Sequence, residues 1–210
     1  MNRRELLAGG LVAGASLALP ARALAQGFTG FAQPSGLTPY QQRILAVARR
    51  EAERAGARLW RRDIVGIADF AQPSAQARFH FANLENGSVR SFYVAHGKGS
   101  DPEHCGMLQT FSNVPGSWAT SRGAYLTCEW YNGKYGTSIR LEGMDADNSM
   151  ALDRAIVMHP ADYARPTMIS TYGKLGRSEG CFAMAPEQFN EALWHLSGGR
   201  LLYADRIGEV

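Results

Sequence analysis

The sequence predicts a mainly β fold with two or three helices, of the sandwich or barrel type. Short apolar runs rich in Val, Ile, Phe and Tyr recur from residue 63 onward. Asn-Gly pairs at residues 86–87 and 132–133 lie between such runs, a pattern typical of β-hairpin turns. The chain has 210 residues with 45% apolar content, which suits one domain with a sizeable core.

Residues 1–25 are expected to be an export signal. Arg3-Arg4 precede an apolar stretch over residues 6–19, and Ala23-Leu24-Ala25 fits a cleavage site with small residues. The paired arginines favour a twin-arginine signal; a general secretory signal is the alternative. A membrane anchor is disfavoured because the apolar run is shorter than the ~20 residues of a spanning helix, so no stable span is expected after processing. The expected location is the periplasm or cell envelope.

Residues 26–62 are expected to hold a flexible lead-in and the first helix. Thr38 and Pro39 read as an N-cap followed by proline in the first turn. Apolar residues over 40–55 fall on one face with charges around the rest, and Gly56 ends the pattern. The sequence therefore predicts an amphipathic helix before the main domain.

Residues 63–210 are expected to form the main domain. A helix is expected over residues 186–194, with proline in its first turn and glutamate near its start. The long irregular segment 96–122 is of the kind that often carries binding function. Strands are expected over residues 64–70, 78–84, 88–94, 123–131, 137–141, 154–158 and 201–204.

The charge pattern argues against a nucleic-acid partner. The formal charge is +3, and the first 25 residues account for most of it. Neither a basic stripe nor an aromatic platform of the kind that binds nucleic acid is evident.

Cys181 and His159 are the candidate nucleophile and base. A free thiol has a pKa of about 8.5 and needs a neighbouring base or positive field to react at neutral pH. His159 closes an apolar run, and Pro160 fixes its backbone in an extended form while offering a carbonyl to the imidazole. Gly180 permits a sharp turn in which N–H groups at residues 180 and 181 can stabilise an oxyanion. A lone cysteine is also a common core residue, and a lone histidine a common structural one.

The three cysteines leave alternatives open. In an oxidising compartment Cys105 and Cys128 could pair and leave Cys181 free, or both could be reduced thiols. A zinc site is a rival of another class, but its candidate ligands lack compact spacing. Those candidates are His96, His104, Cys105, His159 and Cys181.

The run Ser178-Glu179-Gly180-Cys181, after His159, resembles the signature of the L,D-transpeptidase (YkuD-like) family, in a divergent murein L,D-transpeptidase branch. The resemblance covers about residues 63–205 and includes the stretches 94–97, 111–117, 138–143 and 154–159. The widespread form of the family has a second histidine where this chain has Glu179. It also has arginine or asparagine where Ala183 stands, which puts substrate recognition in doubt. Ser178, Arg177, Arg140 and His96 are the candidate substrate contacts.

The resemblance implies a peptidoglycan L,D-transpeptidase without cofactor or metal. Cys181 would form a thioester with the L-centre carbonyl of an L,D bond in a stem peptide, and the diamino-acid amine of a second stem would resolve it into a cross-link. The donor bond is either the third–fourth or the first–second. Carbapenems are expected to add covalently to the thiol. An L,D-carboxypeptidase or other hydrolase on the same substrate, and a non-catalytic peptidoglycan-binding domain, are the alternatives.

Overall fold

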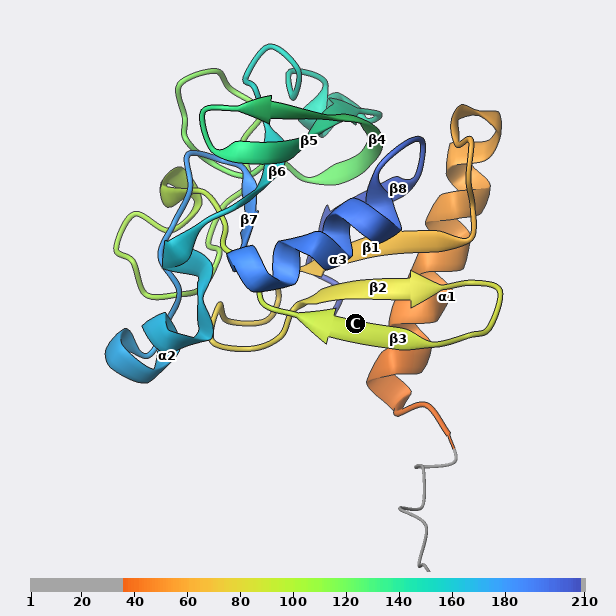
Figure 1. Cartoon of the computed structure of the whole chain (residues 1–210), viewed down its shortest axis with the longest axis horizontal. Helices are drawn as coiled ribbons and strands as arrows, with labels where there is room; N and C mark the ends of the chain where they lie inside the picture. The colour runs from red at the N-terminus through yellow and green to blue at the C-terminus, as the bar shows by residue number, and fades with distance from the viewer. Residues whose placement is uncertain (1–35, 209–210) are drawn as a thin grey trace, which may run out of the picture. The chain divides into compact units, whose positions relative to one another are not determined.

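The computed structural model describes residues 36–208 of the chain. Within them eight strands form one continuous sheet in the order β3-β2-β1-β8-β4-β5-β6-β7 (Figure 1). The predicted mainly β class with a few helices is confirmed. The strands of a sandwich would form two separate sheets, whereas here all eight strands are hydrogen-bonded into one sheet. The expected export signal, residues 1–25, lies outside the described residues.

The strands alternate in direction except at two places. β1 pairs with β8 and β6 pairs with β7 in parallel, whereas the other neighbours are antiparallel. The strands are β1 (Ile64–Asp69), β2 (Phe79–Asn83), β3 (Val89–Phe92), β4 (Gly123–Gly133), β5 (Gly136–Gly143), β6 (Val157–Pro160), β7 (Phe182–Met184) and β8 (Leu201–Asp205).

In the described part of the chain three α-helices accompany the sheet: α1 (Pro39–Ala55), α2 (Pro166–Tyr172) and α3 (Pro186–Leu196). Short 3-10 turns lie at Gly56–Arg58, Lys98–Ser100, Ala146–Asn148 and Asp162–Ala164. The predicted start of α1 is confirmed, because Thr38 Oγ1 accepts from the N–H of Gln41 at 3.1 Å and the Gln41 side chain accepts from Thr38 N–H. The helix ends at Gly56, as expected.

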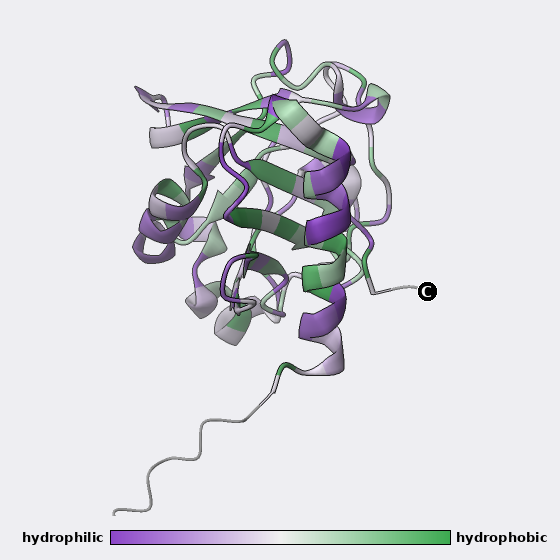
Figure 2. Cartoon of the chain, turned by 90° about the vertical axis from the view of Figure 1, so that its right-hand side faces the viewer, coloured by the Kyte–Doolittle hydropathy of each residue, from purple (hydrophilic) through white to green (hydrophobic). Residues whose placement is uncertain are grey.

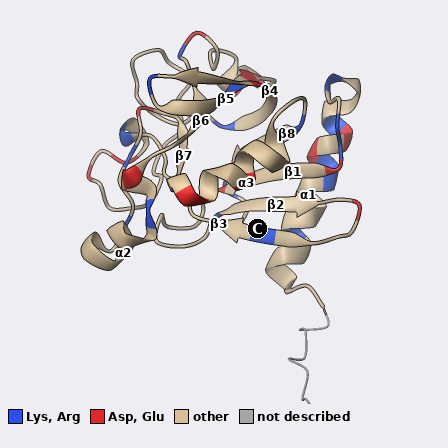
Figure 3. Ribbon diagram, in the orientation of Figure 1, with Lys and Arg blue, Asp and Glu red and all other residues tan. Residues whose placement is uncertain are grey.

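α1 and α3 cover opposite faces of the central strands. Val65 and Ile67 pack with the apolar side of α1, whereas Ile64 and Ala68 belong to the core that includes residues of α3. This follows from the period of two along a strand, which sends successive side chains to opposite faces. Figure 2 shows the central strands largely green and α1 with purple segments, and Figure 3 shows charges of both signs on α1. β1 is buried on both faces and is apolar from Ile64 to Ala68, with the buried Asp69 at its end.

Two predicted elements are displaced. The second hairpin turn is formed by Lys134 and Tyr135, since Gly133 pairs with Gly136 and Asn132 with Thr137. The Asn-Gly prediction was therefore wrong by two residues; a register shift between Thr127 and Trp130 accompanies the longer strand. The strand expected over 154–158 begins only at Val157 and continues through Pro160. The short elements α2 and β7 were not expected from the sequence.

No helix of residues 36–208 is both long enough and apolar enough to cross a membrane.

Candidate active site

Two neighbouring parallel strands carry the candidate nucleophile and base. Met158 pairs with Phe182 and His159 with Ala183, so Cys181, just before β7, is beside the start of β6. Met158 and Phe182 point into the main core. Because side chains alternate along a strand, Cys181 and His159 both lie on the opposite face. With strands ~4.8 Å apart and a rise of ~3.3 Å per residue, their Cα atoms are about 8 Å apart, within reach of the two side chains.

The imidazole of His159 is held in one tautomer. Its Nδ1 lies 2.9 Å from the carbonyl oxygen of Pro160. A carbonyl can only accept, so Nδ1 carries the proton and Nε2 is left as the basic nitrogen. This is the contact expected of Pro160 from the sequence. Burial lowers the pKa of His159, and the bond to Pro160 offsets part of that decrease. The ring is therefore neutral at pH 7.

Aromatic rings surround this histidine. Tyr135, from the tip of the β4–β5 hairpin, stacks on it with ring centroids 4.5 Å apart and an angle of 22°. Tyr163 approaches it edge-on at 6.4 Å. Figure 1 shows the β4–β5 hairpin beside β6. The hairpin tip therefore covers one side of the candidate base and contributes to its desolvation.

The thiol of Cys181 is buried, with 7% of the residue exposed. Its Sγ lies 3.7 Å from the carbonyl oxygen of Ala155. Burial raises the pKa of Cys181, and the charge of Glu179 raises it further, while the Val157 N–H and the Arg154 guanidinium lower it. Both groups of the pair are thus neutral at pH 7. The arrangement can perform base-assisted attack, in which the thiol proton passes to the imidazole as the sulfur bonds to carbon.

Gly180 is packed so closely that only glycine fits. Its φ is +115°, and a Cβ there would lie 2.8 Å from the carbonyl oxygen of Ala119. A Cβ on Gly97 would lie 2.7 Å from the Gly180 Cα. The turn before the cysteine is therefore pressed against two other loops, residues 95–99 and 117–119. The N–H of Gly180 donates to Ser178 Oγ at 3.2 Å.

Ser178 and Arg177, expected as substrate contacts, bind within the protein. Ser178 is buried and its hydroxyl donates to the carbonyl of Cys181 at 2.6 Å. Arg177 donates to the backbone carbonyls of Asp101 and of Pro102, the latter at 3.1 Å. A substrate contact by either side chain would compete with these bonds. Both residues brace the cysteine turn against the segment that follows residue 94.

Arg140 lies on the same face of the sheet as Cys181 and His159, the candidate pair. It pairs with Val157 across β5 and β6, which places it about two strand spacings from Cys181. Its guanidinium binds Glu129 at 2.8 Å and lies over the ring of Tyr131. The side chain is 43% exposed, so it is accessible to a ligand on this face.

His96 is not a surface residue. It is 1% exposed, and its Nδ1 accepts from the fully buried Arg78 at 2.6 Å. Its Nε2 lies 3.4 Å from Asp101 Oδ2. Burial, with the charge of Arg78, lowers the pKa of His96 to about 3. Its carbonyl accepts from the N–H of Ser178 at 2.9 Å, so His96 supports the cysteine turn from beneath, out of reach of a substrate.

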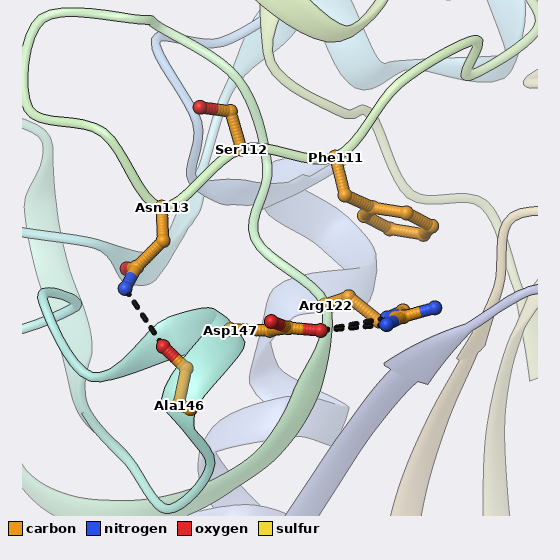
Figure 4. A pocket seen from close by; sticks show the side chains of 6 residues that line it. All are labelled: Phe111, Ser112, Asn113, Arg122, Ala146 and Asp147. Carbon is orange, nitrogen blue, oxygen red and sulfur yellow. Dashed lines mark hydrogen bonds and ion pairs between the residues drawn. The ribbon is translucent and has the colours of Figure 1, made fainter.

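The loop over residues 111–122 borders the site and is fixed by polar contacts. Asn113 donates to the carbonyl of Ala146 at 3.0 Å, and Arg122 pairs with Asp147 at 2.6 Å. Figure 4 shows these contacts around a hollow that Phe111 and Ser112 also line. The far side of the loop is held by Arg154, which donates to the Ser112 carbonyl at 2.7 Å.

Tyr135 and Arg154 were not expected as site residues. Tyr135 was missed because the hairpin turn was predicted at residues 132–133, whereas the observed turn puts Tyr135 at the hairpin tip. Arg154 lies five positions before His159 in one of the stretches that carry the family resemblance. That position could have indicated that Arg154 is close to the site. Neither residue could be placed beside the candidate pair without the pairing of β5, β6 and β7.

The zinc alternative would need a cluster of metal ligands. Among residues 36–208 no group of three or more His, Cys, Asp or Glu side chains could hold a metal ion. His104 Nε2 lies 2.9 Å from the Leu175 carbonyl. All three cysteines are free thiols, with Cys105 exposed and Cys128 partly buried. Cys181 is thus available as a nucleophile.

Residues 39–204 match the family described as L,D-transpeptidase catalytic domain (YkuD_2). The chain belongs to this family. The matched range includes α1. No curated protein is significantly similar to this chain in sequence.

Several solved structures resemble the chain distantly, and two of those described below are L,D-transpeptidases. One from Mycobacterium smegmatis is 15% identical with a TM-score of 0.41, covering 68% of this chain and 58% of that one. L,D-transpeptidase 3 from Mycobacterium tuberculosis, in complex with a faropenem-derived adduct, is 13% identical with a TM-score of 0.44, covering 68% and 60%. The helical cell shape determining protein Pgp2 from Campylobacter jejuni is 13% identical with a TM-score of 0.43, covering 78% and 56%. The chain thus spans less than two thirds of each of these relatives.

Proposed function

We propose that the protein is a peptidoglycan L,D-transpeptidase of the cell envelope, with Cys181 as nucleophile and His159 as general base. One observation carries this proposal: the thiol and the imidazole share one face of two adjacent strands, and Pro160 holds the imidazole with Nε2 as its basic nitrogen. Membership of the family supplies the reaction class.

In the first half-reaction the sulfur attacks the L-centre carbonyl of an L,D bond in a donor stem peptide. The thiol proton moves to His159 Nε2 as the S–C bond forms. Collapse of the tetrahedral intermediate breaks the C–N bond, and the imidazolium returns its proton to the leaving amine. The products are a thioester on Cys181 and the released D-side fragment.

The oxyanion of that intermediate needs N–H donors. Since Gly180 N–H already donates to Ser178 Oγ, we assign the first donor role to the N–H of Cys181. Gly180 N–H can join it only by leaving that hydroxyl. Donors of this kind typically contribute 10²–10³-fold in rate each.

In the second half-reaction the side-chain amine of a diamino acid in an acceptor stem attacks the thioester. His159 takes a proton from that amine and restores it to the sulfur. A third–fourth donor bond gives a third–third cross-link, and a first–second donor bond gives a first–third one. Water in place of the amine would give hydrolysis.

Purified protein incubated with sacculi, followed by mass spectrometric sequencing of muropeptides, tests this proposal. We expect new cross-linked muropeptides that Cys181→Ala does not form, at an unchanged melting temperature. Cys128→Ala is the matched control and should retain activity. Cross-linking by Cys181→Ala would eliminate the mechanism, and shortened stems without cross-links would assign the hydrolase alternative. Binding to sacculi with neither product would leave only the non-catalytic binding domain.

A further inference from the structure

Arg154 lies directly behind the cysteine turn. Its Nη2 is 3.2 Å from the position that a Cβ on Gly180 would occupy, and the guanidinium also donates to the carbonyl of Ala119. The residue after it, Ala155, places its carbonyl 3.7 Å from the Cys181 sulfur. The arginine is thus adjacent to the backbone that carries the nucleophile.

The bonds of Arg154 are all to neutral groups. It donates to the carbonyls of Ser112 and Ala119, with longer contacts to the hydroxyls of Ser117 and Ser121 at 3.4 Å. No carboxylate pairs with it among the ion pairs of residues 36–208. Arginine stays protonated at neutral pH. Its charge is therefore not cancelled by a partner and remains available to act on nearby groups.

We propose that Arg154 is a positioning residue for the reaction of Cys181. The uncancelled positive charge of Arg154 stabilises the negative charge that develops on the sulfur as its proton moves to His159. The role of Arg154 rests on the proposed function, because it is a role within the same candidate site. The acidity of the Cys181 thiol, which the role of Arg154 would change, can be measured without any peptidoglycan substrate.

The other groups that face the sulfur do not supply this charge. Glu179, in the cysteine turn, raises the pKa of Cys181, and His159 on β6 is neutral at pH 7. Burial raises the pKa of Tyr163, beside β6, and of Tyr125 on β4, so both rings are uncharged. Among these groups Arg154 alone brings a permanent positive charge, and it opposes the effect of burial on the thiol.

The test is the pH dependence of alkylation of Cys181 by iodoacetamide, followed by peptide mass spectrometry so that Cys105 and Cys128 are resolved separately. An opposite charge nearby typically shifts a pKa by one to three units. Because Arg154 is partly exposed, we expect Arg154→Gln to raise the alkylation midpoint by about one pH unit and to slow alkylation at pH 7 about tenfold. Arg154→Lys should keep the wild-type midpoint to within about 0.3 unit. Arg122→Gln is the matched control and should change nothing, because Arg122 belongs to the loop that Arg154 contacts but is paired with Asp147.

A purely structural arginine predicts a different result: lower melting temperatures for both Arg154 variants and an unchanged midpoint for Arg154→Gln. That outcome would overturn the proposal. Should Arg154→Gln fail to fold, the role of Arg154 can be tested on two adducts of the wild-type protein. Iodoacetate and iodoacetamide leave isosteric adducts on Cys181, one anionic and one neutral. The anionic adduct should melt at the higher temperature, and equal or reversed melting temperatures would refute the role of Arg154. Failure of the sacculus assay alone would contradict the proposed function but not the effect of Arg154 on the Cys181 thiol.

Discussion

Tyr135 stacks on His159, with 4.5 Å between ring centroids, although the two residues belong to different elements. The ring comes from a hairpin tip and the imidazole from the interior of β6. This contact keeps water from one face of the base, and burial is the main cause of the lowered pKa of His159. The protonation of the base therefore depends on where the hairpin tip lies.

We expect Tyr135→Ala to raise the pKa of His159 towards its ordinary value of about 6.5. In the wild type the pKa is below that value, so the acid limb of the acylation rate lies below pH 6.5. In the variant the limb moves to higher pH, because the better-solvated imidazole is protonated more easily. A pH–rate profile of acylation measures this. Tyr172→Ala, on exposed α2, is the control, and an unmoved limb in Tyr135→Ala would contradict the prediction.

Removal of the base should reduce the rate without removing the nucleophile. We expect His159→Ala to lower the acylation rate about 10²–10⁴-fold, which is the usual contribution of general acid–base catalysis. The loss should shrink above pH 9, where hydroxide ionises the thiol without help. Single-turnover kinetics over pH 6–10 measure both effects. A near-wild-type rate at pH 7 would mean that another group takes the proton.

Covalent inhibition provides a direct probe of the nucleophile. We expect a carbapenem to acylate Cys181 with a mass increase equal to the whole inhibitor, because ring opening releases no fragment. Intact-mass spectrometry detects the adduct and peptide mapping locates it. Cys105→Ala should still react and Cys181→Ala should not. An active enzyme that acquires no adduct at residue 181 would count against the assigned site.

The glycine before the nucleophile should not tolerate a side chain. In Gly180→Ala the added Cβ would lie 2.8 Å from a backbone carbonyl at a φ of +115°. We expect a loss of about 1–3 kcal/mol in the free energy of unfolding, together with most activity. Gly87→Ala is the matched control, since Gly87 has a φ of +70° but nothing within 4 Å. Urea unfolding compares the two, and equal losses would show that contact adds nothing to backbone strain.

Two buried histidines should make the fold sensitive to acid. Burial lowers the pKa of His80 to about 4 and that of His96 to about 3. Their folded pKa values lie below the unfolded value of about 6.5, so the stability is complete above pH 6.5 and is lost as pH falls towards 4 and 3. Each histidine should cost about 1.4 kcal/mol per pH unit in that window. Urea midpoints from pH 7 to 4.5 measure this.

His80→Gln isolates one of the two contributions. The amide cannot take up a proton and can still contact Tyr40 or Ser91, which lie 3.0 and 2.8 Å from the histidine ring nitrogens. The variant should lose stability less steeply below pH 6.5 than the wild type. An identical slope would mean that His80 is already solvated in the native state.

The sequence predicted what depends on local chemistry. The capped helix after Thr38, the Asn-Gly hairpin at residue 86 and the cysteine turn at Gly180 each follow from a few adjacent residues. What depends on distant pairing could not be predicted. Nothing near Leu201 indicates that β8 lies between β1 and β4, and the burial of His96 follows from Arg78, eighteen positions earlier. Arg177 was expected to contact the substrate, whereas backbone carbonyls of another loop bind it.

The place of β8 in the sheet has a consequence for biogenesis. This strand, residues 201–205, joins β1 to β4. While it is still within the ribosome, the two halves of the sheet have no strand between them, and their facing edges remain unpaired. Until β8 inserts, the polypeptide exposes two strand edges with unpaired backbone groups, and such edges favour association with other chains.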